Sequence, residues 1–198
     1  MGYFVRKLRH FEYRPQADFQ RAATITDADS FTQAAHGRNP TQRIEVSIVA
    51  APDDVARRMR LPEGAFVVLR SRLRFLDGEP YQINDSYYPR EVAEGTEVMQ
   101  PRDISEGVNH VLAKTGHAQV RALDEIWVRM PTPAEADRLR ILPGTPVAEH
   151  VITGLTADDR VVRVVRVVLP GDRNVITFER THPDHDVAGS TAVVTEPE

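Results

Sequence analysis

The chain has 198 residues, 41% of them hydrophobic and 27% charged, with a formal net charge of −4. This composition is typical of a globular protein with one good-sized core, and a negatively charged chain is not expected, as a whole, to bind nucleic acid electrostatically. It contains no apolar run long enough to span a bilayer and no signal-peptide pattern, so no membrane partner is expected. The absence of cysteine excludes disulfides and thiolate zinc sites and favours a cytoplasmic location.

Two elements are predicted in the first quarter of the chain. Residues 28–36 favour a short helix that begins at Asp27 or Asp29 and ends at Gly37. Residues 42–50, QRIEVSIVA, alternate between polar and apolar side chains, which is typical of a strand with one buried face.

The segment 69–89, LRSRLRFLDGEPYQINDSYYP, predicts a β-hairpin with two different faces. Side chains alternate between the faces of a strand, so Arg70, Arg72 and Arg74 lie together, opposite the apolar odd-numbered positions. Three arginines on one face form a set of fork-shaped donors that suits a small anionic ligand. The alternative is that they are solvated, or paired with nearby carboxylates, on an open sheet face.

The register of this hairpin depends on its turn. A two-residue turn at Asp77-Gly78 would place apolar residues of the return strand beside the arginines. A three-residue loop that begins at Leu76, with Gly78 in the left-handed conformation, pairs even-numbered positions with each other, and the hydrophobic pattern favours it. The predicted polar face then consists of Arg70, Arg72, Arg74, Gln82, Asn84 and Ser86.

An internal repeat with a shift of 80 residues organises the middle of the chain. The matching positions are Ala56 and Ala136, Met59 and Leu139, Leu61 and Ile141, Gly64 and Gly144, and Val67 and Val147. Each copy predicts a short helix, a Leu-Pro step and a glycine that end it, and then a hairpin: 65–76 with 79–88, and 146–155 with 161–169. The pattern indicates a duplicated helix–hairpin unit within one fold, or a chance similarity, since this punctuation is common.

The remaining elements complete an α+β domain, an antiparallel sheet with flanking helices. The predicted elements are an amphipathic helix at 103–115, capped by Asp103 and ended by Gly116, and strands at 120–129 and 175–180. The run 161–169 is apolar on both faces apart from its arginines, which is typical of a central strand or of an interface strand. Residues 182–198 lack periodicity and are predicted to be a disordered tail.

No motif calls for catalysis, and neither a cofactor nor a metal ion is predicted. None of the seven histidines forms a helical zinc pair, and the pair His182 and His185 lies in the predicted tail. There is no glycine-rich phosphate loop and no nucleophile elbow. The sequence therefore indicates a binding domain and not an enzyme.

Three segments carry a family resemblance: the run 51–89, the second copy EADRLRILPGTPV (135–147) and the late GDRNVITFER (171–180). They resemble the UTRA effector domain, the ligand-sensing half of the HutC-type GntR transcription regulators, over roughly residues 40–180. The most specific part is the R-x-R-x-x-D-G-x-P hairpin, followed by Ser-Tyr-Tyr-Pro. The resemblance implies a chorismate-lyase-like fold.

In such regulators the effector domain follows an N-terminal winged helix–turn–helix that binds operator DNA as a homodimer, usually as a repressor. Residues 2–6 resemble the last strand of the wing, so the DNA-binding domain is expected upstream of this chain and missing from it. The implied organisation is 1–16 for the end of the wing and the interdomain linker, 17–181 for the effector domain and 182–198 for the tail.

The resemblance also implies a site for a small anionic metabolite. Arg72 and Arg74 match the two arginines that hold the effector's anionic group, Asn84 matches a residue that faces the ligand body, and Ser105 matches a serine that helps to hold the anion. Gln82 and Arg70 complete the polar face. Arg163 and Leu169 stand where sugar-phosphate sensors carry Glu and Tyr, and Gly107 replaces a common aromatic residue, which favours a smaller or more apolar organic anion. The alternative is a free-standing chorismate-lyase-like enzyme or an orphan ligand-binding domain.

Overall fold

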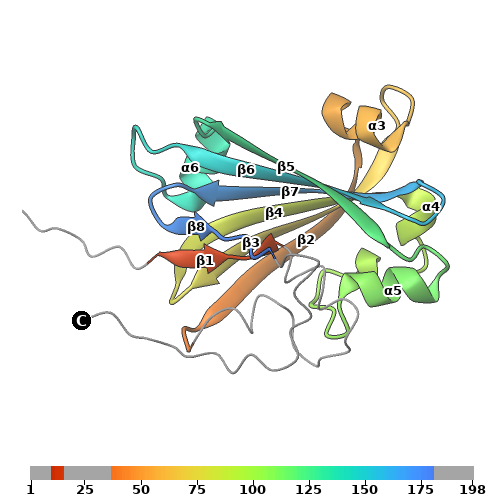
Figure 1. Cartoon of the computed structure of the whole chain (residues 1–198), viewed down its shortest axis with the longest axis horizontal. Coiled ribbons are helices and arrows are strands. Elements are labelled where there is room, and N and C mark those ends of the chain that lie inside the picture. Colours follow the sequence, from red (N-terminus) through yellow and green to blue (C-terminus); the bar gives the residue numbers. More distant parts are fainter. Residues whose placement is uncertain (1–9, 16–36, 181–198) are drawn as a thin grey trace, which may run out of the picture.

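The computed structural model describes residues 10–15 and 37–180 of the chain. Within these ranges the chain forms one six-stranded sheet with helices on both faces, and a separate two-stranded sheet (Figure 1). None of the described helices is long and apolar enough to cross a membrane. The helix predicted at 28–36 lies outside the described residues, as do the predicted domain boundaries after residues 16 and 181, so these stay predictions.

The large sheet has the order β2-β3-β4-β7-β6-β5, and every neighbouring pair of strands is antiparallel. The strands are β1 (Phe11–Tyr13), β2 (Pro40–Ala50), β3 (Phe66–Leu76), β4 (Glu79–Pro89), β5 (Arg121–Arg129), β6 (Val147–Leu155), β7 (Val161–Pro170) and β8 (Asn174–Ile176). The helices are α3 (Asp53–Met59), α4 (Arg90–Ala93), the 3-10 helix η1 (Glu97–Met99), α5 (Val108–Lys114) and α6 (Pro133–Leu139). The predicted α+β class is confirmed, and the run 161–169 is part of the central strand β7.

The internal repeat is larger than the sequence indicated, because each copy also includes the strand before its helix. The first copy is β2-α3-β3-β4 and the second is β5-α6-β6-β7. Val49 pairs with Val67 in the first copy, and the residues 80 positions later (49 + 80 and 67 + 80), Arg129 and Val147, pair in the second. The two copies meet at the β4–β7 pair, so β2 and β5 are equivalent strands at opposite edges of the sheet.

Helices α3 and α6 end in the same way in the two copies. Arg60 and Arg140 follow them in the left-handed conformation, with φ of 55° and 51°. The next amides, those of Leu61 and Ile141, each donate to the carbonyl five residues earlier, at 2.9 Å in both copies. These bonds satisfy carbonyls that the helix itself leaves open, and they turn the chain towards the next hairpin.

The hairpin between β3 and β4 has the predicted register but not the predicted turn. Asp77 and Gly78, with φ of 53° and 80°, form the two-residue turn that the hydrophobic pattern seemed to exclude, and Leu76 belongs to β3. A bulge after Arg74 leaves Tyr81 as an extra residue on β4 and restores the pairing of even-numbered positions. The expected three-residue loop is therefore wrong, because the extra residue lies in strand β4 and not in the turn.

The two faces of the large sheet are covered differently. On one face, α3 packs on Val67, Tyr87 and Val164, and α6 packs on Ile83 and Val168. On the other face, α4, η1 and α5 cover one end with a cluster that includes Val68, Tyr88, Val98 and Leu112. Strands β1 and β8, which lie in front of the sheet in Figure 1, cover the other end through Phe11, Tyr13, Tyr81, Val165, Val167 and Leu169. The middle of this second face lies between the two covers.

Two elements are shorter than predicted. The helix expected from residue 103 begins at Val108, because Gly107 has a φ of 79° and cannot continue a helix, and Asp103 accepts a bond from Gln42 (3.1 Å) instead of capping. Strand β8 has only three residues, of which Val175 and Ile176 belong to the predicted strand 175–180. It pairs in parallel with β1, which was not predicted.

Candidate functional site

The six residues of the predicted polar face lie side by side in the middle of the large sheet; we call them the arginine face. Across the β3–β4 hairpin the pairs are Arg70 with Ser86, Arg72 with Asn84 and Arg74 with Gln82. Arg72 is half-buried and the other five are buried, with Arg70 only 1% and Arg74 only 5% exposed. Burying guanidinium groups is costly unless polar partners surround them, so this face is not the open, solvated surface of the alternative interpretation.

Arg72 is held in position by the return strand. Its Nη2 donates to Asn84 Oδ1 at 2.7 Å and to Ser86 Oγ at 3.1 Å. The Ser86 hydroxyl also donates to Asn84 Oδ1 at 3.2 Å. These bonds fix the plane of the guanidinium across two strands, which is the preorganisation that a planar anionic group such as a carboxylate requires.

Arg70 has a structural role. Its guanidinium donates to the backbone carbonyls of Val98, Gln100 and Arg102, in and after η1. Together with the bond from Gln42 to Asp103, it attaches the segment before α5 to β2 and β3. Arg70 therefore holds the segment that borders the arginine face.

Ser105 lies in the loop that these contacts attach. It is exposed, three residues before the first residue of α5. The structure thus brings its loop to the arginine face without burying Ser105 itself.

Two further predicted residues present buried donors to this face. Arg163 on β7 pairs with Gly154 and lies on the same face as Val165 and Val167. Arg163 Nε and Gln82 Nε2 are buried and have no hydrogen-bond partner among the residues that the structure describes. Buried polar atoms are nearly always paired, so two unpaired donors indicate an acceptor that the described residues do not supply.

A buried histidine connects the sheet to β1. His150 on β6 is fully buried, its Nδ1 lies 2.9 Å from the Tyr13 hydroxyl and its Nε2 lies 2.7 Å from Asp124 Oδ1. A carboxylate only accepts, so Nε2 carries a hydrogen and donates to Asp124. In the neutral imidazole Nδ1 then accepts from the tyrosine hydroxyl. Sequence reasoning missed this chain of bonds, because its three members are far apart in sequence.

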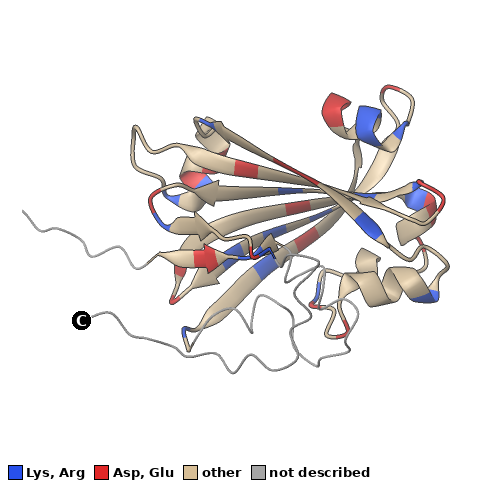
Figure 2. Cartoon of the chain, in the orientation of Figure 1, with Lys and Arg blue, Asp and Glu red and all other residues tan. Residues whose placement is uncertain are grey.

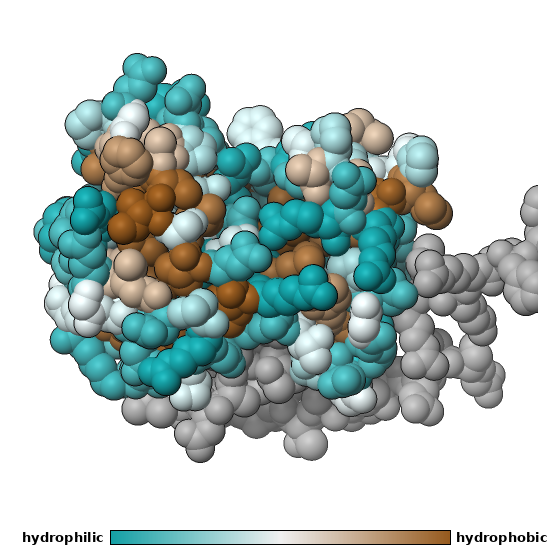
Figure 3. All heavy atoms as spheres, turned by 180° about the vertical axis from the view of Figure 1, so that it is seen from behind, coloured by the Kyte–Doolittle hydropathy of each residue, from teal (hydrophilic) through white to brown (hydrophobic). Residues whose placement is uncertain are grey.

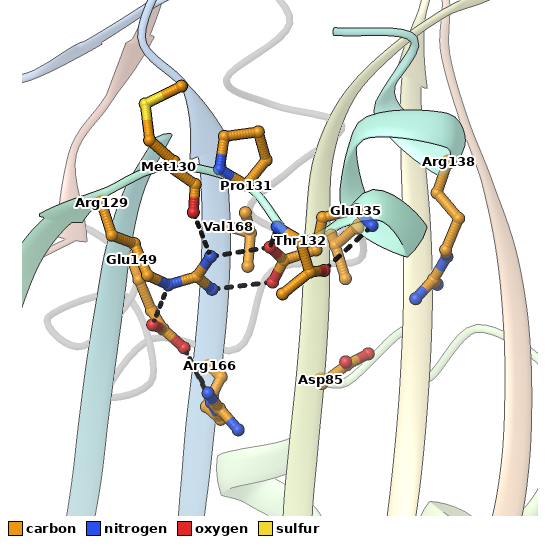
Figure 4. A pocket seen from close by; sticks show the side chains of 11 residues that line it. Asp85, Arg129, Met130, Pro131, Thr132, Glu135, Arg138, Glu149, Arg166 and Val168 are labelled. Atoms are coloured by element: carbon orange, nitrogen blue, oxygen red, sulfur yellow. Dashed lines mark hydrogen bonds and ion pairs between the residues drawn. The ribbon is translucent and has the colours of Figure 1, made fainter. Parts of the chain in front are cut away.

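A pocket of about 410 Å³ lies beside α6, on the face of the sheet opposite the arginine face (Figure 4). Its lining is dominated by charged residues: Asp85, Arg129, Glu135, Arg138, Glu149 and Arg166. Most of these charges neutralise one another. Arg129 donates two bonds to Glu135 and one to Glu149, each 2.7 Å long, and Arg166 donates to the other oxygen of Glu149 at 2.8 Å.

The pKa values of two carboxyl groups in this pocket are shifted in opposite directions. Burial alone would raise the pKa of Glu149, but the bonds from Arg129 and Arg166 outweigh it, so the pKa lies below its usual value. For Asp85, burial dominates and raises the pKa above 3.8, although the Ser71 hydroxyl donates to it and Arg138, Arg166 and Arg72 lie nearby. Sequence reasoning missed this cluster as well.

The chain matches the family model of the UTRA domain over residues 35–175 and belongs to this family. It is 33% identical over 160 residues to the uncharacterized HTH-type transcriptional regulator SCO4628 of Streptomyces coelicolor, a match that covers 79% of this chain and 60% of that protein. UTRA domains are ligand-binding domains of transcription regulators and not enzymes, which confirms that part of the prediction.

Solved structures share the fold at low sequence identity. The effector domain of PhnF from Mycobacterium smegmatis has a TM-score of 0.64 and 22% identity, with 77% of this chain and 95% of that chain covered. The C-terminal domain of the histidine utilization repressor from Pseudomonas syringae pv. tomato has a TM-score of 0.58 and 17% identity, with 72% and 100% covered. The predicted effector-domain fold is therefore confirmed.

Proposed function

We propose that this chain is the effector-binding and dimerisation domain of a cytoplasmic GntR/HutC-type repressor that responds to a small organic anion. A winged helix–turn–helix outside this chain would bind the operator. Membership of the UTRA family and the similarity to an HTH-type regulator support this proposal. An operator with two half-sites calls for a two-fold symmetric protein, hence a homodimer.

The observation that carries the proposal is the buried, donor-rich arginine face. Arg72 is oriented by Asn84 and Ser86, and the unpaired atoms of Gln82 and Arg163 on this face are both donors. Donors that converge on one place suit a ligand rich in acceptor oxygens, such as a carboxylate or phosphate. The face lies between two covers, β1–β8 and the loop before α5, as a site for a small molecule does.

The test is a thermal-shift screen with small organic anions and inorganic phosphate, followed by titration of the best one. A ligand that binds only the folded state raises the melting temperature. Replacing Arg72 or Arg74 by Ala should weaken binding about tenfold to 150-fold, the range of one charge-assisted hydrogen bond. Arg72→Lys should not restore it fully, because a point charge lacks the two-pronged geometry. Arg163→Ala, Asn84→Ala and Ser105→Ala should show smaller losses.

Arg138→Ala is the matched control, since Arg138 is an arginine of the opposite pocket. It should leave the affinity unchanged. If Arg138→Ala abolished binding while Arg72→Ala and Arg74→Ala did not, the ligand would occupy the opposite pocket and the proposed site would be wrong.

A further inference from the structure

Two charged side chains of the opposite pocket, Asp85 and Arg138, take no part in its ion cluster. Among the residues that the structure describes, Asp85 accepts one hydrogen bond, from the Ser71 hydroxyl at 2.5 Å, and forms no ion pair. Arg138 forms no ion pair with them either, and its Nη2 donates to the same Ser71 oxygen at 3.2 Å. The pocket therefore holds one anionic and one cationic group with a single hydroxyl between them, and each has hydrogen-bonding capacity left over.

The first copy of the repeat shows that an arginine at this position can be neutralised within the fold. Arg58 on α3 is the counterpart of Arg138 (138 − 80), and it forms an ion pair with Glu125 on β5. Glu45 on β2 is the counterpart of Glu125 (125 − 80), but it forms no ion pair with Arg138 in the described part of the chain. The second copy thus leaves its arginine uncompensated beside the pocket.

Asp85 is an unfavourable residue for folding at its position. It is half-buried, and burial raises its pKa, because one hydroxyl does not replace the water that the ionised carboxylate loses. Side chains that oppose folding and have shifted pKa values are typical of sites built for a ligand. Asp85 and Arg138 extend toward one another in the pocket, while dashed lines join the members of the ion cluster (Figure 4).

We propose that the opposite pocket binds a small zwitterion, an α-amino acid, with its ammonium group on Asp85 and its carboxylate on Arg138. The ammonium group supplies donors to the carboxylate oxygen of Asp85 that Ser71 leaves free, and the amino-acid carboxylate accepts from the guanidinium. One carbon atom holds both charged groups of an α-amino acid, which suits two side-chain charges separated by one hydroxyl. This is a second site, and it does not depend on the proposed anion site.

The rest of the lining favours an aliphatic side chain on this ligand. Ile83 and Val168 of the sheet and Met130 and Pro131 of the segment before α6 contribute apolar surface. The charges of the ion cluster already have partners, so they do not call for a further charge on the ligand. The volume of about 410 Å³ lies within the usual range for small-molecule sites, about 300–1,000 Å³.

Thermal-shift measurements and calorimetric titration with L-valine, L-leucine and L-methionine give the first test. At least one of them should raise the melting temperature of the purified chain. Asp85→Asn and Arg138→Ala should each weaken its binding about tenfold to 150-fold, the range of one charge-assisted hydrogen bond. Unfolding does not explain such a loss, since Arg138 is exposed and Asp85→Asn removes a charge that opposes folding. Arg58→Ala, the same change at the equivalent position on α3, is the matched control and should leave the affinity unchanged.

Two analogues of leucine test the roles of the two charges separately. 3-Methylbutylamine lacks the carboxylate and 4-methylpentanoate lacks the ammonium group. Both should bind about tenfold more weakly than leucine or worse, because each leaves Arg138 or Asp85 without its partner. If 4-methylpentanoate bound as tightly as leucine and Asp85→Asn did not weaken it, the pocket would be an anion site and the zwitterion would be wrong.

The outcomes separate this inference from the proposed function. Amino-acid binding that is lost in Arg72→Ala and kept in Asp85→Asn and Arg138→Ala would place the amino acid on the arginine face and overturn the second site. The absence of binding by all three amino acids would overturn it as well. Neither result bears on the anion titration, and an arginine face that binds no anion would leave the amino-acid site standing.

Discussion

The two copies of the repeat have the same order of strands and helix, but different side chains occupy their equivalent positions. On the face covered by α3 and α6, the first copy packs Val49, Val55 and Leu69 in an apolar cluster under α3. The positions 80 residues later carry an ion cluster of Arg129, Glu135 and Glu149. Seen from behind the view of Figure 1, hydrophobic side chains gather on the side of α3 and hydrophilic side chains cover the centre of the surface (Figure 3).

The opposite face differs between the copies in another way. Arg70, Arg72 and Arg74 of the first copy correspond to His150, Ile152 and Gly154 of the second, again 80 residues apart. The second copy uses this face to hold β1 through His150, and Gly154 leaves room for Gln119, whose side chain lies 2.4 Å from where a Cβ would stand.

Charged residues therefore occupy different equivalent positions in the two copies. Acidic and basic residues are interspersed over the described elements (Figure 2). The two copies therefore have different roles. The first copy supplies the arginines of the proposed anion site, and the second supplies the ion cluster and the anchor of β1.

The largest effect is expected where the ion cluster replaces the apolar cluster. Glu149→Leu introduces the side chain of its counterpart Leu69, but it leaves Arg129 and Arg166 without the carboxylate between them. Removing one partner of a buried ion pair costs about 3–5 kcal/mol. Both arginines keep more than a quarter of their side-chain exposure, so we expect about 2–3 kcal/mol, measured by urea unfolding at pH 7.

The triple exchange Arg129→Val, Glu135→Val and Glu149→Leu, which copies the first half of the sheet, should recover most of this loss. Replacing charged partners together by apolar residues is often neutral or stabilising. Arg166, the one charge of the cluster that the triple exchange keeps, still has Asp54 at 3.8 Å. The three changes should therefore be strongly non-additive, with a stability within about 1 kcal/mol of the wild type. A triple variant less stable than Glu149→Leu would show that the two copies are not interchangeable here.

A smaller effect is expected at the anchor of β1, which only the second copy provides. Tyr13→Phe removes the donor to His150 Nδ1 and leaves that buried atom unpaired, which should cost about 1–2 kcal/mol. Tyr88→Phe is the control, because the buried Tyr88 hydroxyl has no partner among the described residues, and its removal should change stability little. Hydrogen exchange at the Phe11 and Thr177 amides, which bond across the β1–β8 sheet, should accelerate in Tyr13→Phe alone.

Much of this architecture could be predicted from the sequence, because alternation and turn residues act locally. The hairpin register followed from the parity of Arg70, Arg72 and Arg74, and the repeat followed from its helix-ending signals. The bulge at Tyr81 could not be predicted, since two turn types with different bulges give the same register. The bonds of Tyr13, His150 and Asp124 were also out of reach, because they depend on which strands become neighbours. The ion cluster had a signal that was overlooked: charged residues occupy positions where the other copy is apolar.

The smallest effect is expected at the β4–β7 pair, which is the seam where the two copies meet. Asp85 on β4 stands opposite Arg166 on β7, yet Arg166 pairs with Glu149 and approaches Asp54. Within the described part of the chain, Asp85 accepts a hydrogen bond only from the Ser71 hydroxyl. Burial raises its pKa above the value of 3.8 that it has when unfolded. An acid with a raised pKa in the folded state destabilises the fold when it is ionised. Asp85→Asn keeps an oxygen for Ser71 and removes that charge, so it should raise the urea midpoint slightly at pH 7.

The pH dependence of this gain distinguishes it from a general packing effect. The gain should be full above the folded-state pKa of Asp85, shrink as the pH falls, and vanish below 3.8, where the wild-type carboxyl is protonated in both states. Asp158→Asn is the control, because bonds from Thr156 and Arg160 lower the pKa of Asp158, so its ionised form is favoured in the fold and no gain is expected. A loss of stability in Asp85→Asn at pH 7 would mean that Arg138 or Arg166 pairs with Asp85 after all. The two copies would then be joined by an ion pair across their seam, and not merely by the β4–β7 ladder.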